Sequence, residues 1–297
     1  MVIRFLVLLL PALIVVAACG DRPEPAGPDR LRVVATTAVI GSLAEEIGGE
    51  RIKLTVLITA GTDPHDFEIR NSQRRDIDDA DLLLRHGLGL DDFLSGIVNA
   101  DDPRAVTVTD GSRLRTVSGE PDPHTWHDAD NAILMATAVA TALGGGDPSG
   151  RFEFESALAA LVDRIRVADS AIATSFASVP SVRKSVVTNH DSLGYFLDRY
   201  GVSLVGIVIP GFSTATEPSA RDIARLIETI EEGQAVAILA EGSASTKIAS
   251  ELASDTGLPI VEGLYGDTLG PPGSGAETID RMLLYNARLI TEALSVD

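Results

Sequence analysis

The chain has 297 residues, of which 45% are hydrophobic and 23% charged, an ordinary mixture for a globular protein of one large or two moderate domains. Its net charge of −19 argues against a nucleic acid or an anionic lipid surface as a partner, because like charges repel. A surplus of acids attracts cations, but a soluble surface also accounts for it. Aromatic residues are only 4%, so the core has to rely on Leu, Ile, Val and Ala.

The first 18 residues have the pattern of a secretory signal. Arg4 precedes the apolar run Phe5–Val16, which is too short to span a membrane, and small residues follow it. Val16-Ala17-Ala18-Cys19 resembles the bacterial lipobox, in which the signal is cut before the cysteine and the cysteine is lipidated. The alternative is a plain secretory signal with an incidental cysteine. Cys19 is the only cysteine, so an intramolecular disulfide is excluded.

Residues 19–30 are rich in Pro, Asp and Gly, which predicts a flexible tether. From residue 31 onward, apolar β-branched runs alternate with helical patterns. The strands expected in the first half are Leu31–Ala35, Ile52–Ile58, Asp81–Arg85 and Ala105–Thr109. The helices expected there are Ser42–Ile47, Ser72–Asp79, Asp91–Val98 and Asn131–Leu143, the last one ended by Gly144-Gly145-Gly146-Asp147-Pro148.

One long helix is expected over Arg151–Ser178, where apolar residues recur every three or four positions without Pro or Gly. At 1.5 Å per residue it would be about 40 Å long, enough to run along two lobes. Pro180 closes it. A long crossover helix within one domain is the alternative.

The second half repeats the alternation. Its expected strands are Ser185–Thr188, Leu204–Ile209, Val236–Ala240 and Pro259–Val261. Its expected helices are Leu193–Tyr200, Ser219–Glu232, Thr246–Thr256 and Ala276–Leu294. This order predicts an α/β fold with parallel sheets covered on both faces. With the long helix, it favours two lobes, residues 31–147 and 181–297, joined by a rigid connecting helix over residues 150–180.

All five histidines lie in or beside loop-like motifs rich in turn formers and acids. They are His65, His86, His124, His127 and His190. Imidazoles that are far apart in the sequence and converge only in the fold make a metal site the first hypothesis.

Four potential ligands come two from each half of the chain. In α/β sheets, ligands bind beyond the carboxyl ends of the strands. His65 and His190 each follow an expected strand, Asp267 lies in the loop after the last strand, and His124 lies in a loop before a helix. Three imidazoles and one carboxylate suit Zn²⁺, whereas Mn²⁺ prefers more oxygen. Taken singly, each has a simpler reading as a turn, strand-end or loop residue bonded to the backbone.

Several motifs carry a specific resemblance over nearly the whole chain after the signal. They are Asp63-Pro64-His65-Asp66-Phe67-Glu68, Gly87-Leu88-Gly89-Leu90-Asp91, Asp122-Pro123-His124-Thr125-Trp126, Thr188-Asn189-His190-Asp191, Glu217-Pro218-Ser219 and Asp267-Thr268-Leu269-Gly270. In this order the chain resembles the zinc/manganese-binding lipoproteins of ABC transporters, the metal-specific class of extracellular solute-binding proteins.

The resemblance implies a metal ion held by His65, His124, His190 and Asp267 in the cleft between two (β/α) lobes. It further implies an extracytoplasmic, usually monomeric protein, anchored to the cell membrane through a lipid on Cys19, at the cell surface or in the periplasm. Such proteins deliver metal to a membrane ABC permease and move little on binding, since the connecting helix resists hinge closure.

Some residues depart from the family pattern and bear on the choice of metal. Gly111–Glu120 is short and lacks the histidines that many zinc-specific members carry between their first two ligands. Several manganese-specific members have Glu in place of His190. That difference favours zinc, with manganese as the alternative.

Other residues are expected to support the site rather than bind metal. His86 stands where the family often has Asn, and His127 follows His124 by three residues; both are expected in supporting or structural roles. Candidate acceptors that could orient the ligand imidazoles are Asp128, Asp191 and Glu241.

Two other classes of function compete with metal capture. A secreted zinc hydrolase would need a catalytic motif, but the chain has no His-Glu-x-x-His, Gly-x-Ser-x-Gly or Gly-x-Gly-x-x-Gly. A catalytic zinc also keeps a position open for water, which Asp267 would fill. Cell adhesion is a second role of some family members, but no feature of this sequence marks an adhesive surface. Ligand imidazoles must be neutral to bind a metal, so metal affinity is expected to fall as pH drops below about 6.5.

Overall fold

The computed structural model describes residues 30–212, 214, 217–232, 235–242 and 246–295. The expected signal, Cys19 and nearly all of the tether lie outside the described residues. Within the described ranges, no helix is both long enough and apolar enough to cross a membrane.

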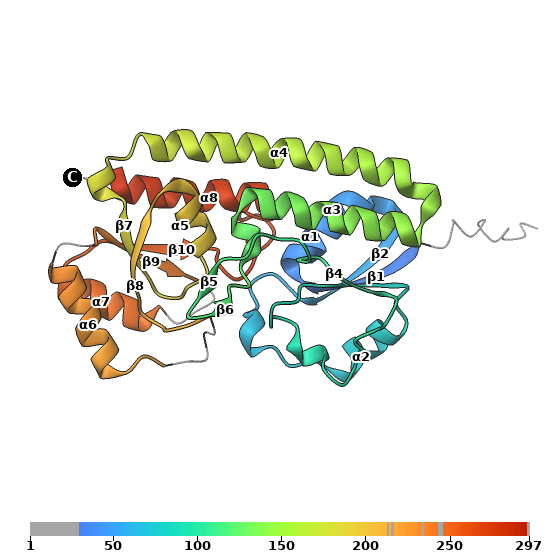
Figure 1. The fold of residues 1–297 in the computed structure, drawn as a ribbon, viewed down its shortest axis with the longest axis horizontal. Helices are drawn as coiled ribbons and strands as arrows, with labels where there is room; N and C mark the ends of the chain where they lie inside the picture. The colour runs from blue at the N-terminus through green and yellow to red at the C-terminus, as the bar shows by residue number, and fades with distance from the viewer. Residues whose placement is uncertain (1–29, 213, 215–216, 233–234, 243–245, 296–297) are drawn as a thin grey trace, which may run out of the picture.

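Two four-stranded parallel sheets form the two lobes of an α/β fold (Figure 1). The N-lobe sheet has the order β2-β1-β3-β4, with β1 Leu31–Thr37, β2 Ile52–Ile58, β3 Leu82–Arg85 and β4 Ala105–Thr107. The C-lobe sheet has the order β10-β9-β7-β8, with β7 Ser185–Thr188, β8 Ser203–Ile207, β9 Ala237–Glu241 and β10 Ile260–Leu264. Every pairing in both sheets is parallel, as the alternation of strands and helices predicts.

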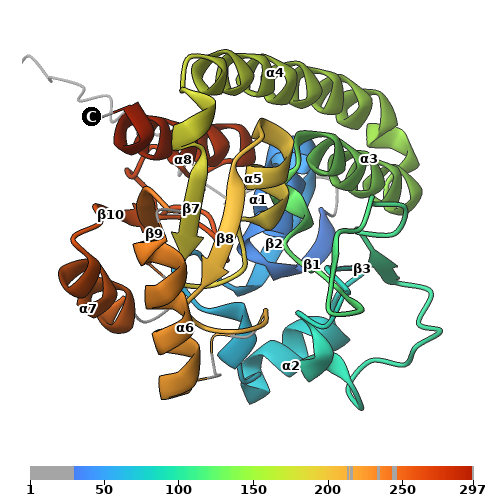
Figure 2. The same ribbon diagram turned by 60° about the vertical axis from the view of Figure 1, so that its left-hand side comes forward.

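Helix α4, Arg151–Ala177, lies across both lobes (Figures 1 and 2). It packs on α1 and α3 of the N-lobe, Ala38–Gly48 and Ala129–Gly146, and on α5 and α8 of the C-lobe, Gly194–Tyr200 and Ile279–Ser295. The other sides of the sheets are covered by α2, Asn71–Asp78, and by α6 and α7, Ala220–Glu231 and Lys247–Thr256. The expected long helix is therefore present and connects the lobes.

One hydrophobic core continues from lobe to lobe beneath α4. It includes Ile40 and Met135 of the N-lobe, Ile165 and Ile172 of α4, and Met282 of α8, all at most 1% exposed. Smaller clusters fill the opposite face of each sheet. Opening the lobes like a hinge would expose part of the continuous core, which costs about 25 cal/mol per Å² of apolar surface.

One expected helix is wrong. Asp91–Val98 contains only the short 3₁₀ turn Asp92–Leu94. The Asp91 carboxylate accepts the backbone N–H of Gly87 and is held in the loop, while Gly96 takes a φ of +77°, which ends any helical course.

The end of α3 also differs from expectation, because the helix continues through all three glycines and stops at Asp147. A side chain at Gly146 would collide with Leu31, so close packing on β1 explains a glycine inside this helix. A short antiparallel hairpin, β5 Thr116–Val117 and β6 Glu120–Pro121, was not expected at all.

Candidate metal centre

The two Asp-Pro-His sequences fold into the same local turn. In each, the aspartate Oδ1 accepts the backbone N–H of the histidine two residues later, at 2.8 Å for Asp63 and His65 and 3.0 Å for Asp122 and His124. The intervening proline has no N–H to compete for the carboxylate. The backbone of each turn therefore fixes the place of its histidine. His65 lies in the loop after β2, and His124 lies in the loop before α3.

His124 is oriented by a buried carboxylate. Its Nδ1 donates to Oδ1 of Asp122 at 2.7 Å, and the other oxygen of Asp122 accepts from Nη1 of Arg115 at 2.7 Å. This arrangement turns Nε2 of His124 toward Oδ1 of Asp267, 3.1 Å away. A carboxylate that fixes the ring of a metal-binding histidine is a common feature of metal sites.

His190 lies two residues after the end of β7 and is also fully buried. Its Nε2 donates to the carbonyl of Phe212 at 2.5 Å. Its Nδ1 therefore faces inward, 3.6 Å from Oδ1 of Asp267 and 3.7 Å from Oε1 of Glu241.

Asp267 brings the cluster together from the loop after β10. Its Oδ1 lies 3.1 Å from Nε2 of His124, 3.4 Å from Nε2 of His65 and 3.6 Å from Nδ1 of His190. One ligand atom from each of the four residues lies within 4.8 Å of the others. Bonds of about 2.1 Å in a tetrahedron place neighbouring ligand atoms about 3.4 Å apart, close to the spacings found here.

The side chains of the cluster are secluded from solvent. Those of His124, His190 and Asp267 are 0% exposed, and that of His65 is 9% exposed. The structure thus brings together all four residues that the sequence singled out as potential ligands.

Carboxylates in and beside the cluster determine whether its histidines are protonated. Burial by itself would lower the pKa of His124, but hydrogen bonds and charge from Asp122 and Asp267 outweigh it and raise the pKa to about 9. The pKa of His190 is raised to about 10 in spite of burial, by Glu241 and Asp267. Burial would raise the pKa of Asp267, but hydrogen bonds from His124 and His65 hold it well below its usual range.

His86 and His127 lie outside the four-residue cluster and contact the backbone beside it. Nε2 of His86 donates to the carbonyl of Pro123, and Nε2 of His127 donates to the carbonyl of Gly266, both at 2.8 Å. Each carbonyl belongs to the residue before a member of the cluster. Burial lowers the pKa of both imidazoles to about 4, so both are neutral at physiological pH.

The acceptor that orients His124 was missed in the sequence. Asp122 does so, and the spacing of Asp-Pro-His could have indicated it. The expectation for Asp128 is wrong: its side chain caps α3 through the N–H groups of Asp130 and Asn131 and pairs with Arg199 at 2.9 Å. A residue directly before a helix uses its carboxylate to satisfy the free N–H groups of the first turn.

The other two candidate acceptors divide between two roles. Glu241 is fully buried beside His190, so it remains a candidate for orienting that ring. Asp191 instead accepts from Nη1 of Arg115 at 3.0 Å. Arg115 thus bridges two buried carboxylates, Asp122 two residues before His124 and Asp191 directly after His190.

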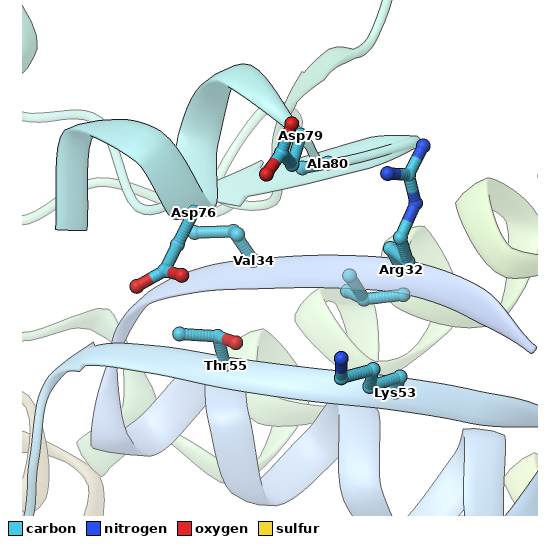
Figure 3. A pocket seen from close by; sticks show the side chains of 8 residues that line it. Arg32, Val34, Lys53, Thr55, Asp76, Asp79 and Ala80 are labelled. Atoms are coloured by element: carbon cyan, nitrogen blue, oxygen red, sulfur yellow. The ribbon is translucent and has the colours of Figure 1, made fainter. Parts of the chain in front are cut away.

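A separate hollow of about 170 Å³ lies beside β1, β2 and α2 (Figure 3). Arg32, Lys53, Asp76 and Asp79 line it, and Arg32 is engaged by Asp81 at 2.6 Å. It flanks the beginning of β1 and β2, whereas His65 follows the end of β2. The hollow is thus distinct from the histidine cluster.

Comparisons with known proteins agree with this architecture. A family model described as zinc-uptake complex component A, periplasmic (ZnuA) matches residues 33–293. The metal ABC transporter substrate-binding lipoprotein ScbA of Streptococcus cristatus is 27% identical over 307 residues, covering 98% of both chains. The manganese ABC transporter substrate-binding lipoprotein PsaA of Streptococcus pneumoniae is 26% identical, covering 98% of this chain and 97% of the relative.

Solved structures show the same similarity. The periplasmic zinc-binding protein TroA from Treponema pallidum matches with a TM-score of 0.83 at 26% identity, over 90% of this chain and 100% of that one. A cadmium-bound periplasmic metal-binding protein from Candidatus Liberibacter asiaticus matches with a TM-score of 0.79 at 25% identity, over 88% and 98%. The chain belongs to the zinc-uptake component A family, which is made up of the metal-binding proteins of ABC transporters.

Proposed function

We propose that this protein captures one divalent transition metal ion outside the cytoplasm, with His65, His124, His190 and Asp267 as ligands, and delivers it to a membrane ABC permease. The supporting observation is the buried set of three imidazoles and one carboxylate, with ligand atoms within 4.8 Å of one another. The metal is the cargo of the protein. His65 is the member of the set with residual exposure, so we propose that metal enters past it.

We propose zinc as the preferred ion. A donor set of three nitrogens and one carboxylate at near-tetrahedral spacing suits Zn²⁺, and zinc binds more tightly than manganese to any given site of this kind. Manganese remains the alternative, because PsaA, a relative of similar length, is named for manganese while TroA is named for zinc. The nearby carboxylate of Glu241 is a further oxygen that a manganese site could use.

The test is a metal analysis of the purified protein followed by competitive titration of Zn²⁺ against Mn²⁺. One ion per chain is expected, with zinc displacing manganese, and His124→Ala should weaken binding strongly. The proposal would be overturned if the purified protein bound neither ion, or if His124→Ala bound metal with unchanged affinity.

We further propose that the chain works as a monomer and that a lipid on Cys19 holds it at the membrane. Its two lobes are proposed to be residues 31–147 and 181–297, joined by residues 150–180. Metabolic labelling with a radioactive fatty acid should mark the protein, and Cys19→Ala should abolish the label and release the protein from the membrane fraction. Label that persists in the variant would contradict the anchor.

A catalytic role is the alternative function, and we propose that the protein has none. The carboxylate of Asp267 stands among the three imidazoles, where a hydrolytic zinc site would keep a place for water. Hydrolysis of ester or peptide substrates by the zinc-loaded protein, lost on substitution of a nearby acid such as Glu241, would favour the enzyme instead.

A further inference from the structure

The carbonyl of Gly266 receives two hydrogen bonds from the opposite lobe. Nε1 of Trp126 donates to it at 3.1 Å, and Nε2 of His127 donates to it at 2.8 Å. Trp126 is 1% exposed and His127 is 0% exposed. Since a carbonyl oxygen has two lone pairs, these two donors use its whole accepting capacity.

Both donors lie on the short turn that also carries a proposed ligand. The 3₁₀ helix Thr125–His127 has His124 as its N-terminal cap. Gly266 comes from the loop after β10 and directly precedes Asp267. One N-lobe turn therefore supplies a proposed ligand and holds the backbone beside the ligand that the C-lobe supplies.

The other side of Gly266 is also closed. A side chain at this position would collide with the carboxylate of Glu241 and the hydroxyl of Ser192. The peptide unit before Asp267 is thus fixed between two N-lobe donors and a C-lobe wall. Small shifts of this unit would move the Asp267 carboxylate relative to the three imidazoles.

Both side chains act as donors to the Gly266 carbonyl at physiological pH. An indole N–H can only donate. Burial lowers the pKa of His127 to about 4, so the ring is neutral and its single N–H is the one on Nε2 that Gly266 accepts. Within the described residues, Nδ1 of His127 has no hydrogen-bond partner, so the bond to Gly266 is the ring's polar contact.

We infer that Trp126 and His127 are positioning residues that hold the Gly266 carbonyl and so preset Asp267 among the imidazoles across the lobe boundary. The inference rests on the proposed metal capture and adds residues that act through a ligand. Loss of a contact that orients a ligand typically weakens metal binding 10- to 100-fold. Loss of the His127 donor should fall in that range.

The test compares His127→Leu, which removes the donor, with His127→Gln, whose side-chain amide can still donate. Zn²⁺ affinity is measured by competition with a chelator, and the visible bands of bound Co²⁺ report the coordination of the site. The Leu variant should bind about 10- to 100-fold more weakly with altered Co²⁺ bands. The Gln variant should regain most of the affinity, and Trp126→Phe should show a loss of the same kind.

A double-mutant cycle with Asp267→Ala separates positioning from general destabilisation. If His127 acts through Asp267, His127→Leu should cost little further affinity once that carboxylate is gone. An equal loss in both backgrounds, or wild-type affinity in His127→Leu, would overturn the inference. If His127→Leu does not fold, the Gln and Trp126→Phe variants decide in its place. A wild-type protein that binds no metal would refute the proposed function itself.

Discussion

Metal binding should release two protons at neutral pH. In the metal-free protein the pKa values of His124 and His190 are raised to about 9 and about 10, so both rings are protonated at pH 7. Three carboxylates surround them, those of Asp122, Asp267 and Glu241. A divalent ion that replaces two protons leaves the charge of this buried cluster unchanged, which avoids the cost of adding charge to a desolvated site.

The expected magnitude follows from linkage. Each proton that must leave makes the apparent affinity rise by about tenfold per pH unit below its pKa, so two protons give at most about 100-fold, or about 2.7 kcal/mol, per unit. The affinity should climb between pH 7 and pH 9 and level off near pH 10. Imidazoles of ordinary pKa would give a fall only below about pH 6.5.

Two measurements together check this. Chelator competition from pH 6.5 to pH 10 gives the slope, and calorimetry in buffers of different protonation enthalpy counts the released protons. A His190→Glu variant serves as the comparison and should release one proton fewer at pH 7. Affinity that is flat between pH 7 and pH 9, or release of less than one proton at pH 7, would refute the reasoning.

The same shifts have a consequence for stability. A histidine whose pKa is higher in the folded state than in the unfolded chain stabilises the fold fully below about pH 6.5. That contribution is lost as pH rises toward the folded pKa of about 9 for His124 and about 10 for His190. The urea midpoint of the metal-free protein should therefore decrease over this window.

Other predictions concern the residues around the site. Asp122→Asn should weaken Zn²⁺ binding at pH 10 by about 10- to 100-fold, whereas Asp128→Asn, which alters a helix cap and the ion pair with Arg199, should leave it unchanged; equal effects would contradict the assignment. Gly266→Ala should lower the free energy of unfolding by about 1–3 kcal/mol through the clash with Glu241, measured by urea denaturation, and an unchanged midpoint would show that the loop can adjust. Arg115→Met should lower the free energy of unfolding by about 3–5 kcal/mol at pH 7, measured by urea denaturation, because two buried carboxylates lose their counter-charge. The decrease should be smaller in acid, where those carboxylates are protonated.

Much of the fold follows from local patterns in the sequence. The bounds of β2 and β7 match the expected strands, because runs such as Ile52–Ile58 are β-branched or apolar at every position but the exposed Lys53, close to the pattern of a buried parallel strand. Helix α4 is continuous from Arg151 to Ala177, since its apolar positions keep one face and no Pro or Gly interrupts them. These signals depend on neighbouring residues alone.

Where packing overrides local preference, the expectations fail. The glycines at the end of α3 remain helical because Gly146 lies against Leu31, a contact between residues more than a hundred positions apart. The segment Asp91–Val98 is not a helix because the Asp91 carboxylate is taken up by the backbone of Gly87. The first contact joins distant segments, and the second, although its residues are only four positions apart, is a bond from backbone to side chain that apolar periodicity does not report.

From the sequence alone, the histidine motifs and their places after the expected strands were enough to indicate four side chains as potential metal ligands. The tertiary structure decided which atoms face one another, since the orientation of each ring depends on partners from other segments, as with Phe212 for His190. It also decided the supporting roles. Asp122 orients His124, Asp128 caps a helix, and His127 donates to the Gly266 carbonyl of the other lobe. Residue type and spacing indicate a metal, whereas hydrogen-bond direction and burial arise only when the two halves of the chain pack together.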